Sequence, residues 1–380
     1  MSDLLIEGDA ACSGNSAEAD RRAVSCRLLK LPRAPRLECG RLGGRQTVIA
    51  NELNFKTTTT YDAAGRPATV QYAKGNRETL VFDAVGQQLQ SVFSDTRVTF
   101  AYDPVGNRTT MQDQSGVTTY AYSARSEVTR VTWALLPVVS RYDAVGNRVS
   151  MTDPNGDVTH YHYDAADRLT QQTLPAGERY TLQYDDTSNN TTMLYAVGSQ
   201  VCTFDGLGRV LTQIEYIGAN PVSTIVDAYD AGGRKISQTR DGGTAQYVYD
   251  NKSQLTGQLK SGARATYSYD PNGNQLVKHH EGGSAMTMMY DAANRLTTAQ
   301  DGATRVTFTF DNNGNMTREE RPASDYQYTY LGNNLLLSAS DPSVTDLVKY
   351  DGDGLRRVTK VSGAITSFVW DGSDYLGEVK

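Results

Sequence analysis

Aspartate is the residue type with the clearest capacity for chemistry in this sequence, because it recurs along the chain and its carboxylate can bind a cation. A twelve-residue calcium loop needs carboxylates at alternating positions, glycine at the sixth position and glutamate at the twelfth. Counted from Asp270, Glu281 stands at the twelfth position, but Gln275 replaces the glycine. Loops counted from Asp311 and Asp351 match at neither position. The sequence therefore favours aspartates that form turns over aspartates that bind calcium.

One pair of histidines offers a second metal hypothesis. His160 and His162 would share one face of a strand, because side chains alternate between the two faces. His279 and His280 are the remaining histidines, and no matching carboxylate signature accompanies them. We predict no metal site from either pair.

The four cysteines form neither a CxxC motif nor a spacing typical of metal ligands. Cys202 lies two residues before Phe204, on the same face of a predicted strand, so we expect a buried structural thiol there. Cys12, Cys26 and Cys39 lie in the N-terminal segment, and no pattern pairs them in a disulfide.

Motifs of known enzyme classes are missing from the sequence. It contains no GxSxG, HExxH, phosphate-binding loop or dinucleotide fingerprint. Carboxylates are so frequent that no single acid–base pair stands out. We therefore predict no catalytic, cofactor-binding or metal-binding residue, no cofactor and no enzymatic activity.

The aspartates belong to a repeat that organises most of the chain. An aromatic residue closes an alternating apolar run, and aspartate follows it in all but two copies, where Ser123 and Leu331 stand instead. Most intervals are 20 or 21 residues, which is the range of stacked repeat architectures. The sixteen aromatic anchors are Tyr61, Phe82, Tyr102, Tyr122, Tyr142, Tyr163, Tyr184, Phe204, Tyr229, Tyr249, Tyr269, Tyr290, Phe310, Tyr330, Tyr350 and Trp370.

Each repeat predicts one β-hairpin. Val98, Phe100 and Tyr102 alternate with polar or small residues, which is the period of a half-buried strand. The carboxylate of Asp103 can accept hydrogen bonds from backbone N–H groups of a turn, and Gly106 can supply a positive φ. A single hairpin is not stable in water, so successive hairpins must pair edge to edge. We expect an all-β chain of tandem antiparallel hairpins in one long, coiled sheet.

Tyrosine at the anchor position indicates a boundary between an apolar layer and a polar one. The chain has 23 tyrosines and 8 phenylalanines. The tyrosine ring can pack while its hydroxyl group meets water or a polar partner. The plainer alternative is that tyrosine simply favours strands.

We divide the chain into a non-repeat segment, residues 1–54, and a repeat array, residues 55–380. Residues 16–31 could form a short amphipathic helix, and a loose linker follows. The longer interval after Phe204 predicts an extended loop at residues 218–221. The apolar stretch from Trp133 to Val139 is expected to cover a sheet edge.

Composition limits the partners and the location. The net charge of −6 and the pI near 5.4 argue against a nucleic-acid partner. No apolar run approaches about 18 residues, so no transmembrane helix is predicted. The N-terminus lacks the apolar region of a Sec signal, so a secreted or cell-surface protein would need another export route.

The repeats resemble the YD-repeat (Rhs) family, named for its Tyr-Asp pair. Residues 102–108 (YDPVGNR) and 142–148 (YDAVGNR) are close to the family consensus, and the resemblance extends over about residues 55–380. Residues 368–372 (FVWDG) resemble a segment that members carry shortly before their shell closes. The resemblance implies a coiled β-sheet shell of the kind found in bacterial polymorphic toxins, insecticidal toxin complexes and teneurins. In bacterial members such a shell encloses a C-terminal toxin, which a self-cleaving aspartyl module separates from the shell.

This chain departs from the family in one respect. The family's cleavage signature, Asp-Pro-x-Gly-Leu, is absent, because none of the four Asp-Pro pairs continues with x-Gly-Leu; these pairs begin at Asp103, Asp153, Asp270 and Asp341. We therefore expect no self-cleavage and no toxin activity from this sequence.

The leading hypothesis is a structural shell or shell segment of a secreted or surface toxin or adhesion system. Its partners would be a toxin or other polypeptide cargo, or further shell repeats. One alternative is a binding module whose tyrosines contact cell-surface glycans. Another is a β-propeller of eight four-stranded blades, although the Gly-His and repeated Trp-Asp signals of such blades are missing.

Overall fold

The computed structural model describes residues 39–42, 45–341 and 343–379. These residues form strands and turns, without a helix. Accordingly, none of the described segments is a helix with the length and apolar character needed to cross a membrane. The predicted helix at residues 16–31 lies outside the described residues.

The chain divides into two compact units. The middle unit contains Asp143–Ser150 and Val158–Tyr267 among its described residues, and the flanking unit contains those of Pro32–Tyr142, Met151–Asp157 and Ser268–Lys380. Two of the divisions fall within strands, namely β12 (Arg148–Thr152) and β23 (Ala263–Tyr269).

The flanking unit holds two series of strands. The first series is β1 (Cys39–Leu42), β2 (Arg45–Ala50), β3 (Lys56–Tyr61), β4 (Pro67–Gln71), β5 (Arg77–Phe82), β6 (Gln88–Val92), β7 (Arg97–Tyr102), β8 (Arg108–Asp113), β9 (Gly116–Tyr122), β10 (Val128–Trp133) and β11 (Leu136–Tyr142). The second series is β24 (Gln275–His280), β25 (Ala285–Tyr290), β26 (Leu296–Asp301), β27 (Thr304–Phe310), β28 (Met316–Arg321), β29 (Ser324–Tyr330), β30 (Leu336–Ser340), β31 (Thr345–Tyr350), β32 (Arg356–Val361), β33 (Ala364–Asp371) and β34 (Asp374–Val379).

The middle unit holds ten complete strands. They are β13 (Val158–Tyr163), β14 (Leu169–Thr173), β15 (Arg179–Tyr184), β16 (Asn190–Tyr195), β17 (Gly198–Phe204), β18 (Val210–Ile217), β19 (Asn220–Tyr229), β20 (Lys235–Arg240), β21 (Gly243–Tyr249) and β22 (Leu255–Lys260). Within each of the three series, every strand pairs antiparallel with the next. The predicted all-β array of antiparallel hairpins is confirmed.

The turn after each anchor has the chemistry that the sequence predicts. Gly106 N–H donates to the carbonyl of Asp103 at 3.0 Å, and Gly106 adopts a φ of 98°. The pairing of Tyr102 with Arg108 skips one residue relative to the preceding pair, so the turn ends in a bulge. The Asp103 carboxylate accepts backbone hydrogen bonds from Val105 at 3.0 Å and Asn107 at 2.8 Å. Aspartate therefore closes the turn, as predicted.

The degenerate copy keeps the same geometry with other residues. The Ser123 hydroxyl group accepts from Arg125 N–H at 3.1 Å and from Glu127 N–H at 3.3 Å. Ser126 takes the positive φ, 64°, that glycine supplies elsewhere. A hydroxyl oxygen at the aspartate position is thus sufficient for this turn.

The second turn of many repeats is a two-residue connection. Asp241 and Gly242 link β20 to β21 with φ values of 50° and 85°, as a type I′ turn requires. Ala134 and Leu135 make the equivalent turn between β10 and β11 at 49° and 67°. The stretch from Trp133 to Val139 therefore belongs to a regular hairpin, and the prediction that it covers a sheet edge is wrong.

The extra residues between the anchors Phe204 and Tyr229 lengthen two strands and do not form a loop. Ile217 pairs with Asn220, so only Gly218 and Ala219 connect β18 to β19. These strands have 8 and 10 residues, longer than most of their neighbours. The predicted extended loop at residues 218–221 is wrong, because Asn220 and Pro221 continue the ladder. At the other end of the chain, β2 pairs with β3, so strand pairing includes residues before position 55; the boundary at residue 55 stays a prediction about the repeat pattern.

The anchor tyrosines lie at a polar boundary, as predicted. Tyr122 is half-buried, and its hydroxyl group donates to the Arg108 carbonyl at 2.8 Å. Tyr249 donates in the same way to the Lys235 carbonyl, also at 2.8 Å. Each hydroxyl group thus ties one repeat to the backbone of the preceding one.

Arginine side chains in the turns add a second link between repeats. Arg168 Nε donates to the Asp164 carboxylate of its own turn at 2.8 Å. Its guanidinium group also lies 4.8 Å from the ring centroid of Tyr184, the next anchor. In other repeats an asparagine makes the link to the next turn. Asn147 Nδ2, for example, donates to Asp167 Oδ1 of the next turn at 2.8 Å.

Among the residues that the structure describes, large apolar side chains are deeply buried in the flanking unit alone. The buried large apolar residues among those described are Phe93, Val98, Met111, Trp133, Val138, Met151, Leu331, Val348, Phe368 and Val369. In the middle unit the buried apolar residues are Cys202, Ala245 and Ala265, and the other apolar strand side chains are half-buried or exposed. The burial of Cys202, 3 % exposed, agrees with the predicted structural thiol.

Candidate functional site

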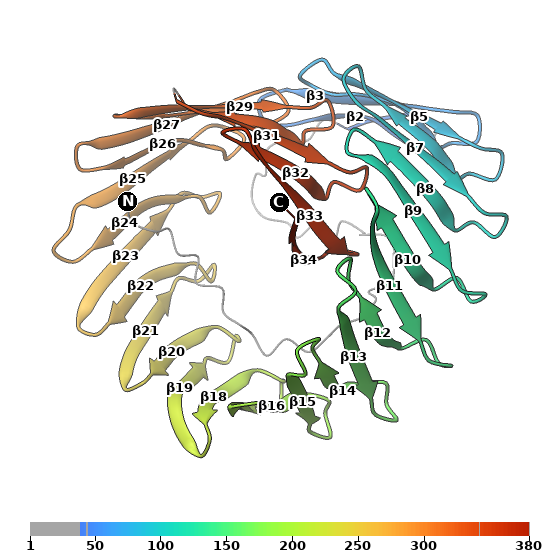
Figure 1. The fold of residues 1–380 in the computed structure, drawn as a ribbon. Coiled ribbons are helices and arrows are strands. Elements are labelled where there is room, and N and C mark those ends of the chain that lie inside the picture. Colours follow the sequence, from blue (N-terminus) through green and yellow to red (C-terminus); the bar gives the residue numbers. More distant parts are fainter. Residues whose placement is uncertain (1–38, 43–44, 342, 380) are drawn as a thin grey trace. The chain divides into compact units, whose positions relative to one another are not determined.

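The most elaborate side-chain arrangement lies inside the flanking unit, where the C-terminal repeats contact the N-terminal repeats. Strand β33 runs beside β11, and the neighbouring strands of the second series lie against the first (Figure 1). We call this region, formed by residues 74–142 and 311–373, the cross-repeat contact. Its partners are far apart in sequence, so only tertiary structure brings them together.

Three consecutive anchor turns of the C-terminal repeats meet three consecutive second turns of the N-terminal repeats. Lys74 N–H donates to Asn313 Oδ1 at 2.7 Å, across 239 residues. Gly332 N–H donates to the Asp95 carboxylate at 2.9 Å, across 237 residues. Gly352 N–H donates to Asp113 Oδ2 at 2.7 Å, again across 239 residues. The nearly constant offset shows that the two series are in register with each other.

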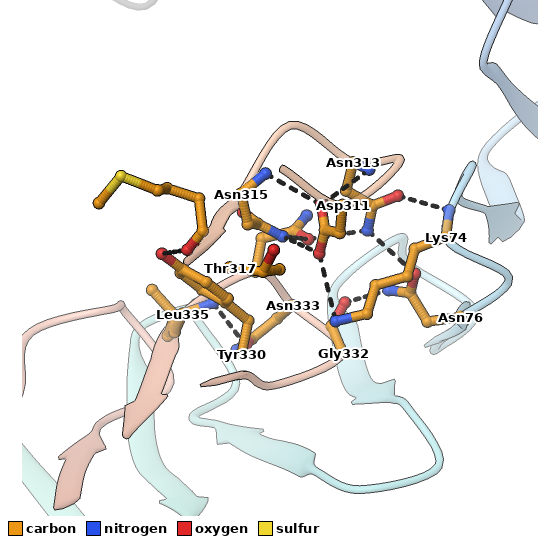
Figure 2. Close-up of polar contacts among 12 residues, drawn as sticks. Lys74, Asn76, Asp311, Asn313, Asn315, Thr317, Tyr330, Gly332, Asn333 and Leu335 are labelled. Carbon is orange, nitrogen blue, oxygen red and sulfur yellow. Dashed lines mark hydrogen bonds and ion pairs between the residues drawn. The ribbon is translucent and has the colours of Figure 1, made fainter. Parts of the chain in front are cut away.

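The first of these contacts contains an ion pair and an amide network (Figure 2). The Lys74 ammonium group lies 3.3 Å from Asp311 Oδ2. Asn313 Nδ2 donates to Asn76 Oδ1 at 3.0 Å, and Asn76 in turn donates to the Gly332 carbonyl. Polar groups therefore join the turn of Lys74 and Asn76 to two turns of the C-terminal repeats.

Glycine is required where the second and third turns approach the sheet. A Cβ atom at Gly332 would stand 2.7 Å from Phe93 Cδ1 and 2.8 Å from an Asp95 carboxylate oxygen. A Cβ atom at Gly352 would lie 2.8 Å from the sulfur atom of Met111. Contacts this short do not occur for real side chains, so both turns depend on glycine.

A buried ion pair follows the third turn. Arg357 Nε donates to Asp351 Oδ2 at 2.8 Å, and the residues are 5 % and 3 % exposed. The Arg357 guanidinium group also lies 5.3 Å from the ring centroid of Trp133, which is 5 % exposed. Burial raises the pKa of Asp351, and Arg357 opposes this effect.

A second ion pair lies closer to solvent. Arg108 donates hydrogen bonds to both carboxylate oxygens of Asp353, at 2.7 and 2.5 Å, and to the Tyr120 hydroxyl group at 2.9 Å. Burial alone would lower the pKa of Arg108, but the hydrogen bond to Asp353 raises it overall. Burial raises the pKa of Tyr120 to about 12.

Beyond the third turn, the contact leaves a cavity of about 440 Å³. Val131 and Val138, on β10 and β11, are among the residues that line it. Leu355 and Trp370, from the C-terminal repeats, also line it. The valine, leucine and tryptophan side chains of this cavity can contact an apolar group.

The aspartates and histidines considered for metal binding lie in turns and on an exposed strand face. The Asp270 carboxylate accepts from Asn272 and Asn274 N–H at 2.9 Å, and Asp311 and Asp351 accept equivalent turn bonds. His160 and His162 are exposed on one face of β13. Among the described residues, no three or more His, Cys, Asp or Glu side chains are grouped to hold a metal ion.

Sequence reasoning missed the cross-repeat contact entirely. Asp353 and Arg357 look like ordinary turn and strand residues in a single repeat. The one available signal is glycine as the second residue after the anchor, at Gly332 and Gly352, where most repeats carry alanine, proline or another residue. This signal is weak, because Gly206 stands at the same position of its repeat, and a Cβ atom added there would have nothing within 4 Å.

Comparison with known proteins agrees with this architecture. The RHS Repeat family model matches residues 142–179 and 163–200, and the Teneurin YD-shell model matches residues 203–370. No curated protein matches the chain.

Solved structures show the same fold at low sequence identity. A crystal structure of TcdB2-TccC3-Cdc42 is 14% identical, with a TM-score of 0.61 over 84% of this chain and 22% of that chain. The Photorhabdus luminescens Tc holotoxin pore, carrying a TccC3 mutation, is 15% identical, with a TM-score of 0.59 over 86% of this chain and 23% of that chain. The present chain thus spans less than a quarter of these proteins. Its repeats, its all-β hairpin fold and the two family matches together show that the chain belongs to the YD-repeat family of RHS and teneurin-type YD-shell proteins.

Proposed function

We propose that this chain is a structural wall segment of a YD-shell, and that it encloses or presents another polypeptide in a secreted or cell-surface bacterial system. Support comes from the family and from the fold shared with TcdB2-TccC3. In this proposal the chain has no catalytic role, and its partners are a polypeptide cargo or further shell repeats.

The observation that carries the proposal is the unequal covering of the sheet. In the flanking unit, the face of β7 to β11 that carries Val98, Met111 and Val138 is buried where the C-terminal repeats contact it. In the middle unit no large apolar side chain is buried among the described residues, and the anchor rings stay half-buried. A half-buried apolar layer of this kind suits contact with a further polypeptide.

The glycan-binding alternative is less well supported. Sugars stack on exposed aromatic faces, whereas the anchor rings are half-buried and spaced for packing between repeats. Several of their hydroxyl groups are engaged by backbone carbonyls, as in Tyr122 and Tyr249. These rings therefore serve the sheet itself.

A protection experiment tests the proposal. An unfolded, protease-sensitive polypeptide is fused after Lys380, and the same polypeptide is fused to an unrelated folded protein as a control. Enclosure or docking predicts that trypsin digests the fused polypeptide more slowly on this chain than on the control. Equal digestion rates, together with saturable binding on a glycan array, would contradict the proposal and favour the glycan alternative.

A further inference from the structure

The cavity of the cross-repeat contact lies next to the third of the three anchor turns that contact the N-terminal repeats. The next turn along the chain, at residues 371–373, lines the cavity. Gly332 and Gly352 are crowded by the N-terminal repeats, as described above. Gly372, at the same position of the next repeat, would place a Cβ atom with nothing within 4 Å. At this repeat Asp371 pairs with Asp374, so a two-residue turn of Gly372 and Ser373 replaces the longer anchor turn that carries Gly332 or Gly352 in the two preceding repeats.

The walls of the cavity are mainly apolar. The apolar and aromatic side chains that line it are Tyr120, Val128, Val131, Val138, Tyr142, Leu355 and Trp370. Apolar walls offer no hydrogen bonds to the several water molecules that this volume would hold. The free energy of the site would fall if an apolar group replaced that water.

The charged residues that line the cavity are Arg108, Asp353, Arg357 and Asp371, and each already interacts with another group of the chain. Arg108 is bound by Asp353 and Tyr120, and Arg357 is bound by Asp351. A charged ligand would have to break one of these pairs or be buried without a partner of its own. The electrostatics of the site therefore favour a neutral occupant.

The Trp370 ring is held in place before any ligand arrives. Its Nε1–H donates to the Arg356 carbonyl at 2.8 Å. Tyr375 packs against it edge to face, with ring centroids 5.6 Å apart. A fixed aromatic wall lowers the entropy cost of binding and favours a flat ring as the ligand.

We propose that this cavity binds a neutral apolar ring, either a small aromatic molecule or an aromatic side chain presented by a polypeptide. Its volume of about 440 Å³ lies within the range of ligand sites, roughly 300–1,000 Å³. Smaller apolar cavities, of roughly 150 Å³, already bind benzene. The proposal does not depend on whether the chain encloses a cargo.

Fluorobenzene, followed by ¹⁹F NMR, is the direct probe. We expect saturable binding to the full chain. Val131→Phe and Leu355→Phe each fill the cavity from a different series of repeats and should weaken binding at least tenfold. Val105→Phe is the matched control, because Val105 is 78 % exposed on a turn outside the cavity, and it should bind fluorobenzene like the unchanged chain. Far-UV circular dichroism and the melting temperature identify which filled variants keep the fold.

Competition identifies the source of the ring. A neutral, capped peptide with one phenylalanine is compared with the same peptide carrying alanine. Displacement of fluorobenzene by the phenylalanine peptide alone supports an aromatic side chain as the occupant, whereas displacement by free toluene but not by either peptide supports a small molecule. The proposal is overturned if fluorobenzene does not bind saturably, or if a folded filled variant binds it as tightly as the unchanged chain.

Discussion

The guanidinium group of Arg108 makes two hydrogen bonds, of 2.7 and 2.5 Å, to the carboxylate of Asp353, which lies 245 residues further along the chain. Arg108 stands directly after an anchor turn of the N-terminal repeats, and Asp353 stands within an anchor turn of the C-terminal repeats. The same turn motif therefore plays two parts in the flanking unit. In one copy it links neighbouring hairpins, and in another it attaches a distant segment to the sheet.

The buried pair of Asp351 and Arg357 should be the most sensitive part of this attachment. Arg357→Met leaves a buried carboxylate without its cation, and we expect a loss of about 3–5 kcal/mol in the free energy of unfolding. The double variant Asp351→Asn with Arg357→Met should lose less than Arg357→Met alone, because no unpaired charge remains. Urea unfolding of the single and double variants measures both effects. Simple addition of the two single losses would contradict a specific ion pair.

The glycines of the cross-repeat contact should not tolerate even one added methyl group. Gly332→Ala and Gly352→Ala are each expected to cost about 1–3 kcal/mol, because the new Cβ atom overlaps Phe93 or Met111. Gly206→Ala is the matched control at the same repeat position, with open space around it, and should change the melting temperature little. Equal effects at all three positions would mean that backbone freedom, and not close approach, explains these glycines.

Removing an anchor hydroxyl group should weaken the link between two neighbouring repeats. Tyr122→Phe and Tyr249→Phe keep the ring but lose the hydrogen bond to the preceding repeat, and we expect a loss of about 1 kcal/mol for each. The two sites share no partner, so the double variant should show roughly the sum of the two losses. Chemical denaturation checks this; unchanged stability in both variants would show that water replaces the carbonyl partner without loss.

Acid should destabilise the repeats through their turn aspartates. Hydrogen bonds from the Asn189 side chain and then from Thr187 lower the pKa of Asp185 to about 2, and the backbone N–H of Arg168 is the main cause of the lowered pKa of Asp164. A carboxylate whose pKa is lower in the folded chain stabilises the fold fully above its ordinary value of 3.8, and this stabilisation is lost as the pH falls through the folded pKa. The melting temperature should therefore fall between about pH 4 and pH 2.

Two substitutions separate the contributions to this pH dependence. Asp185→Asn should flatten the fall in melting temperature below pH 4, because one titrating turn is removed. Asp351 affects the pH dependence of stability in the opposite direction, because its pKa is raised in the folded chain. Its contribution to the stability of the fold is fully present below the ordinary pKa of 3.8 and is lost as the pH rises through the folded pKa. Asp351→Asn should therefore steepen the fall at low pH. An unchanged slope in both variants would rule out this assignment.

The edge of β34 should promote self-association. Strand β34 pairs with β33 on one side, and no described strand pairs with its other side. Unpaired backbone groups on an edge strand are a template for another chain. Light scattering over a concentration series should show growing particles, and Val379→Lys should suppress them, whereas Val105→Lys on an exposed turn should not. A strict monomer throughout the series would contradict this expectation.

The sequence by itself determined the repeating unit of this protein. Tyr102, Asp103 and Gly106 lie within five residues of one another, so their roles follow from local chemistry: a packed ring, a carboxylate that accepts turn N–H groups and a residue that tolerates positive φ. Because the unit recurs sixteen times, antiparallel pairing of successive hairpins follows from the same pattern. Even the degenerate turn at Ser123 keeps the geometry, since its hydroxyl group accepts the same backbone donors.

Only the tertiary structure decided where the buried core lies. Gly206 and Gly332 occupy the same position of the repeat, yet only Gly332 is crowded, because its neighbours Phe93 and Asp95 come from about 237 residues earlier in the chain. Likewise, nothing in one repeat distinguishes Trp133 as the residue that lies under Arg357. A regular repeat specifies how each hairpin meets the next, but the same local pattern is compatible with many long-range alignments. The contacts between distant copies select one of them.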